Sequence, residues 1–169
     1  MRTWAFVLLL LAPLVSARAE EDLEAPEKKP KQIAFAVIVN AKNPLTKVSF
    51  HQLRGYLKVD RQFWPNKKRC DIYLPPRKSA AYDLLLKKVY RMSHKKLQKY
   101  WVRKLFSGQI PAKPSFAASW AAAGKQVQKS LGGVSIVPAD AVPKNVKVLL
   151  IDGKKPGEKG YALAAPAQP

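Results

Sequence analysis

The residues best placed to do chemistry in this sequence lie where a helix is predicted to begin, in the stretch PPRKSAAY. Ser79 is a suitable helix N-cap, and the small side chains of Ala80 and Ala81 leave the first backbone N–H groups uncovered. A helix N-terminus carries a partial positive charge and binds anions. Arg77 and Lys78 place two cations beside it. The stretch therefore predicts an anion site formed by Arg77, Lys78, Ser79, Ala80 and Ala81. An equally good interpretation is that this Arg–Lys pair binds nothing, because adjacent cations are common in so basic a chain.

Other kinds of site find little support in the residue pattern. His51 and His94 have no Cys, Asp or second His at the spacing of metal ligands. The sequence has no G-x-S-x-G motif, no glycine pattern for phosphates or dinucleotides, and no patterned partner for Cys70. Its Asp residues are scattered and suggest no acid–base pair. The pattern predicts a protein that is not an enzyme and that uses no cofactor or metal.

The charge balance predicts an anionic partner. The 169 residues include 31 Lys and Arg but 11 Asp and Glu, which gives a formal net charge of +20. Such a charge attracts small anions, polyanions and anionic membrane surfaces alike, so it does not identify the partner.

Two interpretations of the basic helices are open. In the first, a polyanion-binding surface uses Tyr100 or Trp101 for stacking. Its cations are Lys88, Lys96, Lys99 and Arg103. In the second, the cations form a solvated helix face and the aromatic side chains belong to the core. The spacing of Leu97, Trp101 and Leu105 is typical of a core stripe and favours the second.

The N-terminal residues 1–19 have the pattern of a secretory signal peptide. Arg2 precedes a short apolar run, and Ala17 and Ala19 form an A-x-A site, which predicts cleavage after Ala19 and a periplasmic protein. Residues 20–31 hold five of the acids and predict a disordered acidic leader. Export to the periplasm argues against a nucleic-acid partner.

Alternating strand and helix patterns predict an α/β domain over residues 32–163 and a flexible tail at 164–169. Strands are expected at QIAFAVIVN, CDIYL, VSIVP and VKVLLID. Helices are expected to begin at Ser49, Ser79 and Ser93, and near Ser115 or Ser119. Cys70 lies in the second expected strand and is expected to be a small buried hydrophobe.

The order of these segments resembles the phosphate ABC transporter substrate-binding-protein-like family, from about Ile33 to Leu163. The matching features are the entry IVNAKNP, a loop Trp at Trp64, the run YWVRKLFSG and the strand GGVSIV. The resemblance implies a type II periplasmic-binding-protein-like fold with a mixed sheet flanked by helices. It covers about one lobe of the two that full-length members close around a ligand.

The resemblance places the family's phosphate loop, which reads approximately R-S-D-G-S-G-T, on the opening stretch. Ser79 is kept, whereas Arg77 stands in the position of the aspartate. Pro75, Lys78, Ala80 and Ala81 replace the remaining arginine, glycines and threonine. A carboxylate can accept a proton from phosphate and repels sulfate, so its loss removes the basis for selecting phosphate over sulfate.

The leading hypothesis is a periplasmic single-lobe module that binds phosphate or another small anion without catalysis. The resemblance also implies a link to phosphate ABC transport and thus a membrane transporter as partner. The alternative is a basic interaction protein that docks on an envelope polyanion or an acidic partner protein.

Overall fold

The computed structural model describes residues 32–166, and its central element is strand β1 (Gln32–Asn40). The strand has the predicted bounds, and its apolar run from Phe35 to Val39 is buried. β1 pairs antiparallel with β5 (Gly133–Pro138) and with β6 (Val146–Ile151). The predicted signal peptide and acidic leader lie outside the described residues, as do the last three residues of the predicted tail.

The strands form one mixed sheet. The shorter strands are β2 (Lys47–Val48), β3 (Asp71–Leu74), β4 (Ser115–Phe116) and β7 (Ala164–Pro166). The sheet order is β2–β6–β1–β5–β3–β4, and β7 also pairs with β1. β3 is parallel to both β4 and β5, and β2 is parallel to β6. The predicted mixed α/β architecture is therefore confirmed.

Three short strands were not expected from the sequence. β2 and β4 have two residues each, too few to show an alternating pattern. β7 falls in the expected flexible tail, so the described domain extends to Pro166 instead of ending at Leu163. The Lys88 ammonium donates to the carbonyl of Ala162, just before the strand, at 2.9 Å and to the carbonyl of Ala164 at 3.0 Å, which fixes β7 in place.

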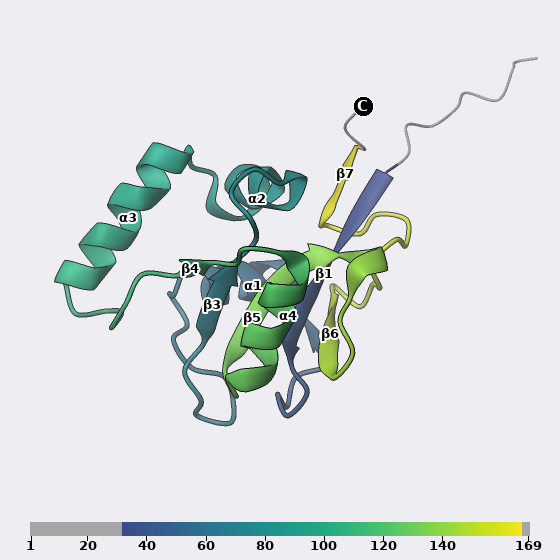
Figure 1. The fold of residues 1–169 in the computed structure, drawn as a ribbon, viewed down its shortest axis with the longest axis horizontal. Helices are drawn as coiled ribbons and strands as arrows, with labels where there is room; N and C mark the ends of the chain where they lie inside the picture. The colour runs from purple at the N-terminus through teal and green to yellow at the C-terminus, as the bar shows by residue number, and fades with distance from the viewer. Residues whose placement is uncertain (1–31, 167–169) are drawn as a thin grey trace, which may run out of the picture.

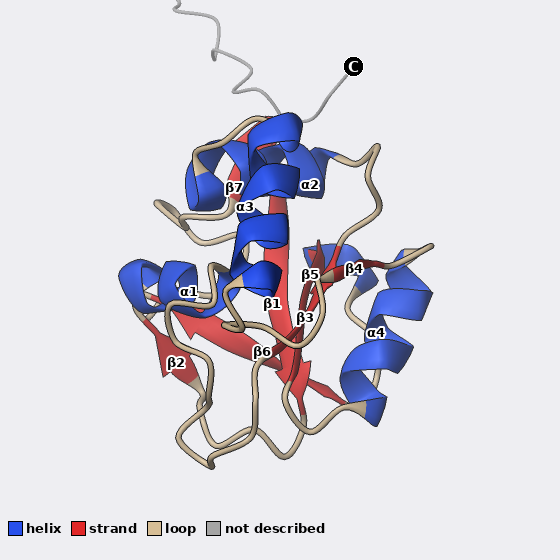
Figure 2. Ribbon diagram, turned by 90° about the vertical axis from the view of Figure 1, so that its left-hand side faces the viewer, coloured by secondary structure: helices blue, strands red, loops and turns tan. Residues whose placement is uncertain are grey.

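Serine caps begin each of the longer helices, as predicted. Ser49 caps α1 (Phe50–Leu57) in a capping box, Ser93 caps α3 (His94–Phe106) and Ser119 caps α4 (Trp120–Lys129). α4 covers one face of the sheet, and α1, α2 and α3 lie on the other side (Figure 2). No helix within residues 32–166 is long and apolar enough to cross a membrane.

The helix that begins at Ser79 is not regular throughout. It starts as α2 (Ala80–Leu84), continues as the π-helical turn η1 (Leu85–Tyr90) and ends at Arg91, which adopts a left-handed conformation with φ of 53°. The wider π turn places Leu85, Val89 and Tyr90 together in the core. The sequence gives no sign of this wider turn, because the spacing of Leu85 and Val89 fits the ordinary helical period of 3.6 equally well.

The loop before β3 is anchored by an aromatic side chain. Trp64 is 2% exposed, and its ring stacks on Tyr56 at a centroid distance of 4.2 Å. Its indole N–H donates to the carbonyl of Gly132 at 2.9 Å. Cys70, at the end of the same loop, is a free, buried thiol, which confirms the expectation for this residue.

Candidate functional site

The candidate site lies at the carboxyl ends of the parallel strands β3 and β4. α/β proteins bind ligands at this edge of the sheet, where loops leave the strands and helices begin. The loop after β3 leads to the N-terminus of α2, and the loop after β4 leads to the N-terminus of α4. The stretch selected from the sequence therefore occupies a topologically suitable position.

Ser79 caps α2, as predicted, and its hydroxyl is engaged within the loop. Its Oγ accepts a hydrogen bond from the Tyr82 backbone N–H at 3.3 Å and donates to the Pro76 carbonyl at 2.6 Å. These two bonds fix the turn between the prolines and the helix. To donate to an anion, the hydroxyl has to give up its hydrogen bond to the Pro76 carbonyl.

Arg77 joins the two loops. Its guanidinium carbon lies 4.4 Å from the ring centroid of Phe116, the last residue of β4. Phe116 in turn packs edge to face against Tyr82 at 5.2 Å. The guanidinium is planar by itself, and contact with an aromatic ring fixes its position while two of its N–H groups can donate to an oxyanion.

The other three predicted residues differ in accessibility. Lys78 is exposed, Ala80 is half-buried at the first position of α2, and Ala81 is fully buried in the core. The first backbone N–H groups of a helix have no partner within the helix. In this conformation, Ala80 can offer its N–H group to a ligand, whereas Ala81 serves the packing of α2.

A pair of side chains that the sequence did not indicate lies next to this loop. The Tyr82 hydroxyl and His94 Nδ1 are 2.8 Å apart, which ties α2 to the start of α3. Burial raises the pKa of Tyr82, although the nearby charge of Arg77 lowers it. The two residues belong to different helices, so no local pattern could have paired them.

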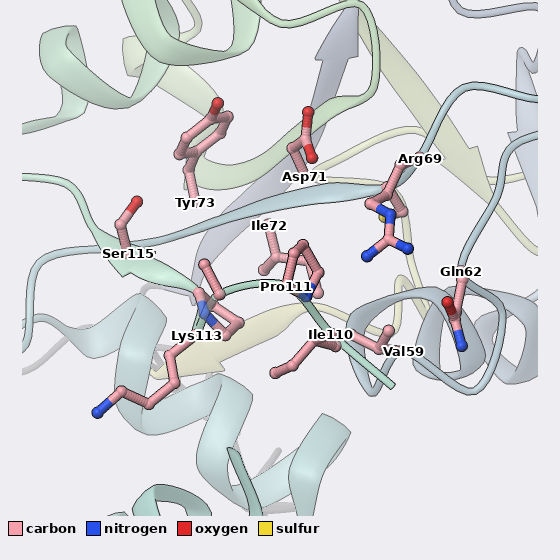
Figure 3. A pocket seen from close by; sticks show the side chains of 13 residues that line it. Val59, Gln62, Arg69, Asp71, Ile72, Tyr73, Ile110, Pro111, Lys113 and Ser115 are labelled. Carbon is pink, nitrogen blue, oxygen red and sulfur yellow. The ribbon is translucent and has the colours of Figure 1, made fainter. Parts of the chain in front are cut away.

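A separate cavity of about 200 Å³ lies between β3 and the loop that precedes β4 (Figure 3). Apolar side chains such as Ile72 and Ile110 line it together with Arg69, Asp71 and Lys113. The Asp71 carboxylate accepts a hydrogen bond from Ser130. None of the five predicted site residues lines this cavity, and it presents no convergent set of cations.

The basic residues of the two helices have different roles. Lys88 is half-buried and bonds to carbonyls of the C-terminal edge, and Lys104 pairs with Asp60 at 3.2 Å. Trp101 is 1% exposed, and the Tyr100 hydroxyl donates to the carbonyl of Lys58 at 2.7 Å. The core interpretation is confirmed for Trp101, and Tyr100 is half-buried against the same core with its hydroxyl engaged.

Within residues 32–166, no three His, Cys, Asp or Glu side chains gather closely enough to hold a metal ion.

Comparison with solved structures places this geometry in a known fold. A protein described as a phosphate ABC transporter substrate-binding protein from Clostridium perfringens, solved with bound phosphate, has a TM-score of 0.64 at 12% identity. The chain shares the fold of phosphate ABC transporter substrate-binding proteins. An ABC-type phosphate transport receptor from Vibrio cholerae (TM-score 0.64, 16% identity) and PstS from Borrelia burgdorferi (0.63, 10%) match it similarly. No family model and no curated protein matches the sequence.

The extent of the similarity agrees with the predicted single lobe. Each of the three matches covers 80% of this chain but 54–55% of the neighbour, so the chain spans about half the length of those proteins. The predicted α/β, single-lobe fold is confirmed.

Proposed function

We propose that this chain is a non-catalytic binding module that holds phosphate or another small inorganic anion in the loop between β3 and α2. The observation that carries the proposal is the position of Arg77, whose guanidinium is packed over Phe116 where two parallel strands end and a helix begins. The fold of phosphate-transport proteins supports the same ligand class.

In the proposed complex, Arg77 donates two N–H groups to the anion, Lys78 adds its ammonium and Ala80 adds a backbone N–H. Ser79 contributes after exchanging the Pro76 carbonyl for the ligand. The loop contains no carboxylate, so phosphate and sulfate are expected to bind with similar affinity.

Replacing Arg77 by Glu together with Ser79 by Ala is expected to weaken phosphate binding by at least tenfold. A hydrogen bond to a charged group contributes about 1.5–3 kcal/mol, and the substitution also puts a negative charge in the loop. Isothermal titration with phosphate, sulfate and an acidic sugar measures the effect. Lys144→Glu, an equal charge reversal on an exposed loop, serves as the matched control.

Two results would contradict this proposal. The first is a wild-type protein that releases no binding heat with any of these anions. The second is a loss of affinity in Lys144→Glu as large as in the double variant, which would mean that net charge and not the loop attracts the ion.

We also propose that the chain is exported to the periplasm by its N-terminal segment. Expression of the full chain in a Gram-negative bacterium is expected to yield a periplasmic protein whose mass corresponds to a chain beginning at Glu20. Mass spectrometry of the periplasmic extract measures this, and a protein that keeps Met1 and stays in the cytoplasm would refute it.

A transporter partner follows from the proposed ligand. If the module serves phosphate transport, genes for a permease and an ATPase are expected beside its own. Neighbouring genes for envelope assembly or signalling would instead favour the interaction protein that docks on an acidic partner or an envelope polyanion.

A further inference from the structure

Helix α3 carries an outer face with an unusual composition. The exposed residues Lys95, Lys99, Val102, Arg103 and Phe106 recur at helical spacing and therefore form one stripe. Lys96 flanks this stripe, and the helix contains no acidic residue. The opposite side of α3 carries the buried Leu97 and Trp101.

The stripe combines cations with exposed apolar side chains. Phe106 is 85% exposed and Val102 is 39% exposed, although most large apolar side chains of the domain are buried. Val102 and Phe106 are four residues apart on the helix, so their side chains form one exposed apolar patch among the cations. α3 also stands at the outer edge of the molecule, away from the sheet (Figure 1).

The cations of the stripe are available for binding. Within residues 32–166, Lys95, Lys96, Lys99 and Arg103 take part in no ion pair, whereas the neighbouring Lys104 is paired with Asp60. The salt bridge, together with the buried side of α3, orients the helix so that the stripe faces outward.

We propose that the outer face of α3 docks on an anionic phospholipid surface. Lys95, Lys99 and Arg103 contact the lipid phosphates, and Phe106 enters the headgroup region beside Val102. A basic amphipathic helix with aromatic and aliphatic side chains among its cations binds the interface by both charge and apolar burial. A soluble polyanion would be recognised by the cations alone and would leave Phe106 in water, whereas a bilayer interface takes up both the charge and the apolar side chains. The proposal uses none of the residues of the anion loop and does not depend on it.

Flotation of the exported protein with lipid vesicles tests the proposal. Binding is expected with vesicles of equal parts phosphatidylcholine and phosphatidylglycerol, and not with phosphatidylcholine alone. At about 1 M salt, where the Debye length is about 3 Å, binding is expected to fall strongly.

Variants of α3 separate the contribution of charge to vesicle binding from that of apolar burial. Lys95→Gln/Lys99→Gln/Arg103→Gln is expected to lower the partition coefficient about 100-fold, because each cation near an anionic membrane contributes about 1 kcal/mol. Phe106→Ser is expected to lower it about tenfold through the lost apolar burial. All variants are first compared with the wild type by circular dichroism and thermal unfolding.

Matched controls remove three positive charges, or one exposed phenylalanine, at positions outside α3. Lys125→Gln/Lys129→Gln/Lys144→Gln changes two exposed lysines of α4 and one in the loop before β6, and Phe63→Ser removes an exposed phenylalanine. Both are expected to bind within about threefold of the wild type, since α4 lies on the other side of the sheet (Figure 2).

Three outcomes would overturn the proposal. One is equal binding to neutral and anionic vesicles, or to neither. Another is an equal loss in the α3 and control triple variants, which would indicate diffuse attraction by net charge. The last is unchanged vesicle binding by Phe106→Ser, which would indicate a face built for a soluble polyanion or an acidic protein.

Discussion

Gly132→Ala is expected to lower the free energy of unfolding by about 4 kcal/mol, near the upper end of single-substitution effects. A Cβ at this position would lie 1.6 Å from the Arg69 carbonyl oxygen and 2.8 Å from its carbon. Both are backbone atoms, so the clash cannot be relieved by rotating a side chain. The Gly132 carbonyl also accepts hydrogen bonds from the Trp64 indole and from the Asp71 backbone N–H, each at 2.9 Å. Urea unfolding followed by tryptophan fluorescence measures the change.

Gly153→Ala is the matched control. Gly153 has a φ of +76°, but a Cβ there would meet no atom within 4 Å. Gly153→Ala is therefore expected to lower the free energy of unfolding only by the cost of the left-handed backbone, about 1–2 kcal/mol. Similar losses at the two positions would show that the close approach of the Gly132 and Arg69 segments is absent in solution.

Alkaline conditions are expected to unfold the domain steeply. Burial raises the pKa of Cys70, Tyr90 and Tyr161 well above their ordinary values, and the charge of Asp71 adds to the shift at Cys70. In the unfolded chain these groups lose their protons near pH 8.5 and pH 10. Because the unfolded state then binds fewer protons, stability is fully present below about pH 8.5 and declines above it. Above pH 10, three such groups together lower the free energy of unfolding by about 4 kcal/mol per pH unit.

Two conservative variants divide this effect between the tyrosines. Tyr90→Phe and Tyr161→Phe are each expected to reduce the slope above pH 10 by about 1.4 kcal/mol per pH unit. At neutral pH they are expected to act in opposite directions, by about 1 kcal/mol each. Tyr90 has a buried hydroxyl with no hydrogen-bond partner among the described residues, so removing it stabilises the domain. The Tyr161 hydroxyl donates to the Phe35 carbonyl at 2.9 Å, so removing it destabilises the domain.

Urea titrations at a series of pH values measure both quantities. A slope that is unchanged in both variants would refute the assignment of the alkaline transition to buried tyrosines. Destabilisation by Tyr90→Phe at neutral pH would mean that its hydroxyl has a partner in solution.

The helix start that we propose as the anion site was predictable from the sequence, but its contacts were not. Ser79 was identified as a cap because the capping bond reaches a backbone N–H only three residues away. The stacking of Arg77 on Phe116 joins two loops that are distant in the chain. The burial of Ala81 also depends on distant segments, because its methyl group packs into a core that several elements supply. Two of the five residues, Arg77 as a stacked cation and Ala81 as a core position, thus acquired their particular roles from the fold.

The same division applies to the whole chain. The sequence by itself determined the β-branched strand β1, the serine-capped starts of the long helices and the strong positive charge, because each depends on residues within a few positions of one another. Only the tertiary structure decided that the segment Ala164–Pro166 becomes strand β7. Its backbone pairs with the distant strand β1, and the carbonyl of Ala164 accepts a hydrogen bond from the Lys88 ammonium. The spacing of Leu97, Trp101 and Leu105 indicated which side of α3 is buried, but only the tertiary structure decided what covers it. η1 and the loop at Asp60 pack against that side and bury Trp101, whereas Phe106, five residues later, remains in solvent, because these segments come from distant parts of the chain.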